Sequence, residues 1–443
     1  MSLKKRLEDT SQDRKTAKPV EKEKDTFTDL KMRIQAQVIQ ELDIDFNEIS
    51  DQNETLKAEL KTIILRCIEK ETLNMTPPQR SRILEELLDE IVGFGPITSL
   101  LQDSSITEIM VNGPNRVFVE IKGKLVKTEV QFKDDNHVMH VIKKIVSMIG
   151  RRIDESSPMV DARLPNGSRV NAIIPPLAID GPALTIRKFA EDPYGINDLV
   201  RFGTLNTKMA EFLKACVVGR MNIVVSGGTG SGKTTTLNVL SSFIPEDERI
   251  VTIEDAAELQ LSQPHVVRLE TKPANLEGRG EVSIRDLVKN SLRMRPDRIV
   301  VGEVRSGEAL DMLQAMNTGH DGSLTTGHAN SPRDMLSRLE TMVLMSGMNL
   351  PVKAIRDQIS SAVNIIVQQS RLMNGSRKIT YITEVIGMEG DVIVLQDIFR
   401  FEQRGVDTKG QVIGEFQFTG IMPSCLRELK EKGISISPQV FGN

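Results

Sequence analysis

The sequence predicts an α/β protein in which a sheet domain that binds phosphate follows a smaller α+β domain and a helical segment. The strongest observation is GGTGSGKT at 227–234, which lies between an apolar run and an amphipathic pattern. Beyond residue 200, apolar strand-like runs alternate with helical patterns. Such alternation is typical of a parallel sheet covered on both faces. At roughly 150 residues per domain, the 443 residues suggest two or three domains.

The N-terminal part is expected to be helical after a disordered tail. Residues 1–25 carry few apolar side chains, so ordering them would cost backbone entropy without compensating burial. From residue 26 apolar residues return at helical spacing, and Thr76 followed by Pro77 has the pattern of a helix start. The sequence therefore predicts a disordered tail at 1–25 and a helical bundle over 26–96.

Short β-branched runs indicate an α+β domain over 97–190. Strands are expected at 106–111, 116–121 and 124–130, with a helix around 136–150 and further strands within 158–189. Turn-forming residues then predict an interdomain linker at 191–200.

The remaining residues, 201–443, are expected to form the phosphate-binding domain. Its apolar strands are predicted at 221–226, 249–253, 297–302, 323–328 and 364–368. We expect these strands to lie in one parallel sheet.

Charge and composition exclude some functions. The 57 Lys and Arg nearly balance the 61 Asp and Glu, which argues against a dedicated nucleic-acid binder but leaves local patches open. Apolar runs are too short for a transmembrane helix. The three cysteines are far apart, which fits a reducing compartment. We expect a cytoplasmic protein that reaches a membrane only through partners.

The glycine-rich segment has the pattern of a phosphate loop. Its backbone amides and the following helix start favour a triphosphate, Lys233 is expected to reach the β and γ phosphates, and Thr234 is expected to hold Mg²⁺. We therefore predict ATP as substrate and Mg²⁺ as cofactor. The predicted nucleotide-binding residues are Gly227, Gly228, Thr229, Gly230, Ser231, Gly232, Lys233, Thr234 and Thr235.

Two acidic clusters follow predicted strands, at the edge where ligands gather in an open α/β sheet. Glu254, Asp255 and Glu258 come after one strand, and Glu303 comes after another. Gly302 stands where many phosphate-loop proteins have Asp. Acids in such places also cap helices, but their joint placement beside a phosphate loop favours hydrolysis.

Two histidines, His320 and His328, bracket the predicted strand at 323–328. The residues alone leave two interpretations open, a sensor of the γ-phosphate or of an interface, and a structural hydrogen-bonding role.

Four ordered segments resemble the Walker A, Asp box, Walker B and His box of the secretion ATPases that power type II secretion, type IV pili and type IV secretion. They are GGTGSGKTTTLN, TIEDAAEL, RMRPDRIVVGEVR and NTGHDGSLTTGHANS, and the resemblance runs from about 80 to 443. RRIDESSPMVDARLPNGSRVNAIIPP and EVIGMEGDVIVLQDIF look like the CpaF branch, the motor of Tad pili. The resemblance implies a RecA-like C-terminal domain, a PAS-like N-terminal domain, nucleotide between them, and a homohexamer.

The resemblance also implies roles for single residues. Glu258 would orient or deprotonate the attacking water, with Glu254 as the alternative, and Glu303 would act on the magnesium side. His328 and His320 would couple the phosphate state to a neighbouring chain. Arg163 and Arg169 would neutralise phosphate charge, although from sequence alone they are equally well explained as exposed residues beside the Asn166–Gly167 turn.

The expected function is an ATP-hydrolysing hexameric motor of a Tad-type pilus or secretion system that drives pilin extension, retraction or both. Its expected partners are inner-membrane platform proteins, and no specific nucleic acid. Two alternatives stay open at this point. One is a RecA-like DNA motor, and the other is a scaffold that binds ATP without hydrolysing it.

Overall fold

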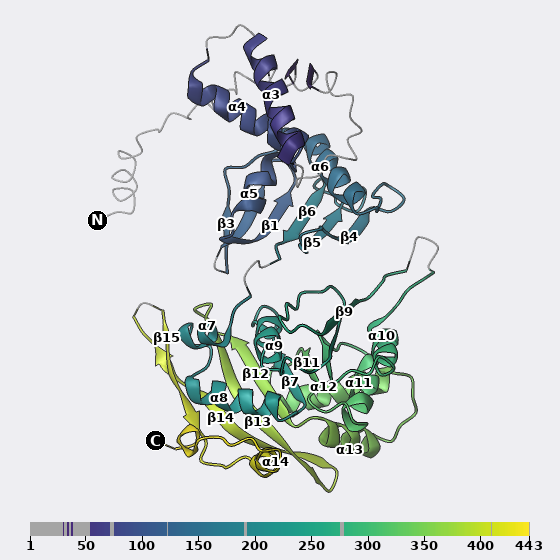
Figure 1. The fold of residues 1–443 in the computed structure, drawn as a ribbon, viewed down its shortest axis with the longest axis vertical. Coiled ribbons are helices and arrows are strands. Elements are labelled where there is room, and N and C mark those ends of the chain that lie inside the picture. The colour runs from purple at the N-terminus through teal and green to yellow at the C-terminus, as the bar shows by residue number, and fades with distance from the viewer. Residues whose placement is uncertain are drawn as a thin grey trace, which may run out of the picture. The chain divides into compact units, whose positions relative to one another are not determined.

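The computed structural model describes residues 54–70, 75–121, 123–189, 193–274, 279–408 and 410–442, with positions 30, 33, 34, 37 and 38. The predicted tail at 1–25 lies outside these residues. The chain divides into two compact units, the first comprising residues 1–164 and 170–187 and the second comprising residues 165–169 and 188–443. Each unit is coloured along the chain in Figure 1.

The first unit begins with packed helices. Helix α3 (Glu54–Lys70) lies against α4 (Pro77–Ile91), and both bury apolar residues in one cluster with Leu30, Ile34 and Val38. Helix α4 starts where the sequence predicts, since the Thr76 backbone N–H and hydroxyl each donate to the Gln79 side chain at 2.9 Å.

The six-stranded sheet of the first unit has the order β3-β2-β1-β6-β5-β4. Helix α6 (Asp135–Met148) buries its apolar face in the same core as this sheet. Lys144 of α6 donates to the Ile91 and Gly93 carbonyls at 2.8 and 2.7 Å, which ties α6 to the end of α4. The other elements are η2 (Gly95–Ile97), α5 (Thr98–Gln102), β1 (Ile106–Asn112), β2 (Val117–Ile121), β3 (Lys124–Lys127), β4 (Met159–Arg163), β5 (Arg169–Ile173) and β6 (Ala183–Arg187).

The second unit contains, within its described residues, a nine-stranded sheet of order β15-β14-β13-β12-β7-β11-β10-β8-β9. The strands from β12 to β9 pair in parallel, whereas β13, β14 and β15 extend the sheet in antiparallel fashion. Their bounds are β7 (Ile223–Gly227), β8 (Ile250–Glu254), β9 (Val266–Glu270), β10 (Arg298–Val301), β11 (Leu324–Gly327), β12 (Ile365–Arg371), β13 (Arg377–Glu389), β14 (Val392–Val406) and β15 (Val412–Phe418).

Helices cover both faces of this sheet, as Figure 1 shows. Ile223 and Val225 of β7 pack with α8, α9 and α14, whereas Val224 packs with α10, α11, α12 and α13. This alternation follows from the period of two along a strand. The helices are α7 (Ile196–Arg201), α8 (Thr207–Val218), α9 (Lys233–Ser241), α10 (Ile284–Ser291), α11 (Glu308–Asn317), α12 (Pro332–Met345), α13 (Val352–Ala362), α14 (Cys425–Glu431) and η3 (Pro438–Val440).

The predicted fold class is confirmed: a RecA-like α/β sheet carries the phosphate loop, and an α+β unit precedes it. Two features differ in detail. Helix α7 begins at Ile196, inside the 191–200 stretch that was expected to be a linker, and ends at Arg201. The sheet is mixed rather than wholly parallel, because β13, β14 and β15, which the sequence did not predict, pair in antiparallel fashion. No described helix is both long and apolar enough to cross a membrane.

Candidate active site

The phosphate loop leaves β7 at Gly227 and enters α9 at Lys233. Gly230 has φ of 70° and Gly232 has φ of 96°, a region that side chains disfavour. A Cβ on Gly227 would lie 2.2 Å from the Gln369 carbonyl oxygen, so glycine is required there by space as well. The residues at 228–230 are exposed, while Ser231 and Lys233 are buried. The loop therefore forms an open tip above a buried base.

Lys233 folds back over the loop. Its ammonium donates to the Gly228 carbonyl at 3.1 Å and lies 3.4 Å from each ring nitrogen of His328. Burial lowers the pKa of Lys233, partly opposed by the charge of Glu303. A buried cation over a glycine-rich turn at a helix start is suited to bind phosphate.

Polar contacts continue from Lys233 across three strand ends. His328 follows β11 and its Nε2 lies 2.9 Å from Glu303 Oε1, while Glu303 Oε2 accepts from Arg305 at 2.7 Å. Arg305 also lies 3.2 Å from Asp255 Oδ2, after β8. Burial lowers the pKa of His328 despite the carboxylate beside it, which favours the neutral ring. The carboxyl ends of β8, β10 and β11 are thus linked to the phosphate loop.

Glu254 is the most buried acid of the Asp-box segment, with 3% of its surface exposed. Its Oε2 accepts from the backbone N–H of Glu258 and Leu259 at 2.7 and 3.0 Å. Its Oε1 is buried without a hydrogen-bond partner among the described residues. Burial raises the pKa of Glu254 to about 7, against the opposing effect of the two backbone N–H groups. This carboxyl is therefore poised to take or release a proton near neutral pH.

The structure also explains Gly302. Strands β8 and β10 are parallel neighbours, and the Gly302 N–H donates to the Ile253 carbonyl at 2.8 Å. A Cβ on Gly302 would lie 2.9 Å from Glu254 Cγ. The side chain of Glu254 thus fills the space that an aspartate at position 302 would need.

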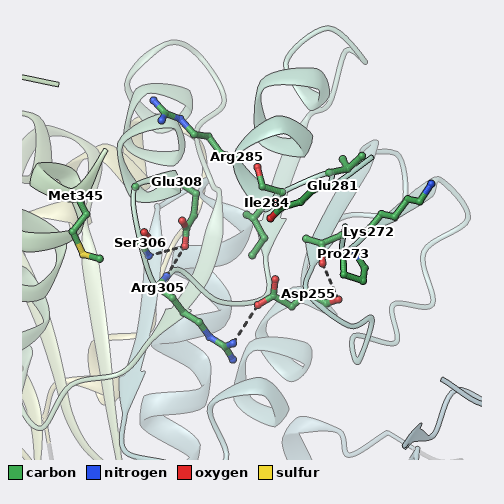
Figure 2. A pocket seen from close by; sticks show the side chains of 14 residues that line it. Asp255, Lys272, Pro273, Glu281, Ile284, Arg285, Arg305, Ser306, Glu308 and Met345 are labelled. Carbon is green, nitrogen blue, oxygen red and sulfur yellow. Dashed lines mark hydrogen bonds and ion pairs between the residues drawn. The ribbon is translucent and has the colours of Figure 1, made fainter. Parts of the chain in front are cut away.

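A pocket of about 510 Å³ borders the acidic end of this network. Figure 2 shows Arg305 reaching toward Asp255 on one side of it, while the Glu308 carboxylate accepts from the backbone N–H groups of Arg305 and Ser306. Because Arg305 also contacts Glu303, this pocket and the predicted catalytic acids share one side chain.

The structure does not bring every predicted site residue together. His320 precedes β11, at the amino end of the strand, whereas the phosphate loop follows the carboxyl end of the parallel strand β7. Arg163 ends β4. Arg169 falls in the 165–169 segment that groups with the second unit, and its Nη1 lies 3.4 Å from Glu258 Oε1.

Sequence reasoning missed three side chains that contact predicted site residues. Arg305 contacts Glu303. Its position two residues after Glu303 in an extended segment could have identified it from the sequence. Arg377 of β13 donates to the Gly230 carbonyl of the phosphate loop, and Gln369 of β12 lies beside Gly232 and accepts from the Thr236 hydroxyl just after the loop. No local pattern marks these two, because their position depends on which strand lies beside β7.

The family described as Type II/IV secretion system protein matches residues 90–388. The chain belongs to this family.

A putative conjugal transfer protein of Mycobacterium tuberculosis is 36% identical over 315 residues, which cover 70% of this chain and 89% of that protein. The conjugal transfer protein TrbB of Rhizobium radiobacter is 36% identical over 294 residues, covering 66% and 86%. The crystal structure of the VirB11 ATPase from the Brucella suis type IV secretion system in complex with sulphate is 31% identical, covers 65% of this chain and 94% of its own, and has a TM-score of 0.36.

The secretion ATPase superfamily expected from the four motifs is therefore confirmed. With an intact phosphate loop and acids at the neighbouring strand ends, this member of the family is an ATPase.

Proposed function

We propose that the chain is an ATP-hydrolysing motor of a type IV pilus or secretion system, of the Tad type, that works as a homohexamer. One observation carries the proposal: the unbroken set of contacts from Lys233 through His328 and Glu303 to Arg305 and Asp255. A phosphate at Lys233 would disturb each of these contacts in turn. A site so arranged can convert the arrival or loss of a γ-phosphate into side-chain movement.

The residues present fit magnesium. The Thr234 hydroxyl and the Glu303 carboxylate are hard oxygen donors of the kind Mg²⁺ prefers. Glu303 Oε1 is also buried, with the ring nitrogen Nε2 of His328 2.9 Å from it. Bound Mg²⁺ would supply positive charge that stabilises the transferring phosphoryl group.

Water activation is proposed for the Asp-box acids. The sequence favoured Glu258 with Glu254 as the alternative, and the pKa of Glu254 near 7 supports Glu254 as the base, since a general base works best with a pKa near the working pH. In this mechanism Lys233 binds the β and γ phosphates, the loop amides orient them, and Glu254 accepts the proton of the attacking water. Arg163 and Arg169 would neutralise phosphate charge, in cis or from a neighbouring subunit. His328 and His320 would pass the phosphate state to the neighbour.

Mechanical work is proposed to come from closure of the two units on ATP and their separation after hydrolysis. The motor would act in the cytoplasm on inner-membrane platform proteins. A second candidate is a conjugation or type IV secretion motor, which the names of the 36% identical relatives favour.

Assembly and partner choice test this proposal. Light scattering of the purified chain should give six times 49.3 kDa in the presence of ATP and Mg²⁺. Capture by Tad platform proteins, but not by conjugation-channel proteins, is expected; the reverse result would assign the second candidate. DNA should not stimulate hydrolysis. Stimulation would favour a DNA motor, and a persistent monomer would contradict the hexamer.

A further inference from the structure

The phosphate loop is contacted by the hairpin of β12 and β13, where the antiparallel part of the sheet begins. Strand β12 runs beside β7, with Gln369 paired to Gly227, and β13 returns beside β12, with Arg377 paired to Arg371. The end of β12 and the start of β13 therefore lie at the same edge of the sheet as the loop. The hairpin reaches the loop at its start, its tip and its end.

At the two ends of the loop the contacts come from Gln369. Its carbonyl oxygen leaves no room for a side chain on Gly227, and its side-chain oxygen accepts from the Thr236 hydroxyl at 2.7 Å in the first turn of α9. Thr236 and Gln369 are both buried. A Cβ on Gly232 would lie 3.0 Å from Gln369 Nε2 and 3.1 Å from Arg377 Cδ.

At the tip the contact comes from Arg377, whose Nε donates to the Gly230 carbonyl at 3.0 Å. In a trans peptide the carbonyl and the next N–H point in opposite directions. The Gly230 carbonyl, which accepts from Arg377, therefore points away from the Ser231 N–H, which donates to the Gly228 carbonyl at 3.3 Å. The ammonium of Lys233 donates to the same carbonyl, so the Ser231 N–H lies beside the cation that is proposed to bind phosphate.

We propose that Arg377 is a positioning residue that holds the phosphate-loop tip in this turn, with the Ser231 N–H beside Lys233, before nucleotide arrives. This rests on the proposed nucleotide site and extends it to β12 and β13. Holding the tip in advance reduces the ordering cost of binding, so the residue strengthens nucleotide affinity without touching the reacting atoms. The charge of its guanidinium makes this contact stronger than one between neutral groups.

The test compares Arg377→Gln, Arg377→Lys and the control Arg400→Gln, an exposed arginine of β14 in the same sheet extension. Binding of a fluorescent ADP analogue is titrated without Mg²⁺, and hydrogen exchange of the amides at 228–232 is followed in the nucleotide-free full chain. Arg377→Gln should bind about tenfold more weakly, the size expected when one charge-assisted hydrogen bond is lost. Its loop amides should exchange faster, and Arg377→Lys should recover part of both effects.

The steady-state signature is a rise in KM that exceeds any fall in kcat. If Arg377 only stabilises the sheet, the melting temperature falls while ADP affinity and exchange at 228–232 match those of Arg400→Gln, and the inference is overturned. If the unsubstituted chain itself fails to bind the analogue, the proposed function fails first, which separates the two results.

Discussion

At the residue scale, Glu254 shows how the fold changes the chemistry of a side chain. Two backbone N–H groups donate to its Oε2, on the side of Gly302, and its Oε1 is buried without a hydrogen-bond partner among the described residues. The resemblance placed Glu258 ahead of Glu254 as the base, whereas the structure favours Glu254. That ranking depends on burial, which only the packing of β8 against β10 determines.

The raised pKa of Glu254 predicts a pH-dependent stability. Its folded pKa of about 7 exceeds the ordinary 4.5, so between these values the folded state keeps a proton that the unfolded state releases. Stability contributed by the neutral form is therefore lost as pH rises through this window. The free energy of unfolding of Glu254→Gln, relative to that of the unsubstituted chain, should therefore rise by up to about 3 kcal/mol from pH 4 to pH 8. Urea unfolding at both pH values measures it.

Glu402→Gln is the matched control, since Glu402 is exposed on β14. The difference in free energy of unfolding between Glu402→Gln and the unsubstituted chain should stay constant with pH. A constant difference for Glu254→Gln as well would show that Glu254 titrates normally and would remove the case for it as the base.

The two histidines show the limit of spacing arguments at this scale. His328 and His320 flank one strand, and from sequence they form a pair. The two histidines lie beyond opposite ends of β11, which is four residues long. Of the two, only His328 lies at the edge of the sheet that carries the phosphate loop. Sequence pattern identified the segment, and strand direction decided which member lies at the site.

At the element scale, β13 supports α14 through one buried acid. Glu384 is 2% exposed, and its carboxylate accepts from the Ser424 and Cys425 backbone N–H groups at 2.8 and 2.6 Å and from the Ser424 hydroxyl at 2.8 Å. Glutamine would place an amide N–H against one of these donors. Glu384→Gln should lower the free energy of unfolding by about 1.5–3 kcal/mol.

Urea unfolding of the full chain checks this, with Glu402→Gln again as control. Hydrogen exchange should also increase in α14, because its N-terminal groups lose their acceptor. A variant with unchanged stability and unchanged exchange in α14 would contradict the assigned role of Glu384.

The elements predicted best were those with strong local patterns. Strands β7, β8, β10 and β12 contain consecutive buried apolar residues, β11 is a short fully buried strand, and α4 begins at the Thr76–Pro77 signal. The long strands β13 and β14 were missed. Bulges between Ile382 and Thr383 and between Val385 and Gly387 shift the alternation, and both strands are partly exposed. Irregular register removes the period of two on which sequence prediction depends.

At the scale of the whole molecule, the phosphate loop lies between two supporting regions of the second unit. One is the acidic network of β8, β10 and β11, and the other is the β12–β13 hairpin. Sequence predicted the first from motifs but not the second, which arises from sheet order. The expected homohexamer, the platform partners and the domain movement rest on resemblance and are tested by assembly and capture.

The central claim is that this loop binds ATP and that the neighbouring acids hydrolyse it. The most direct measurement is phosphate release at saturating ATP with Mg²⁺, by the unsubstituted chain and by Lys233→Ala, with folding checked by circular dichroism. The account predicts steady release by the unsubstituted chain and at least a hundredfold lower release by folded Lys233→Ala, since Lys233 is the loop's own cation on the transferring phosphate. Release at the same rate by both proteins, or background release by the unsubstituted chain, would contradict it.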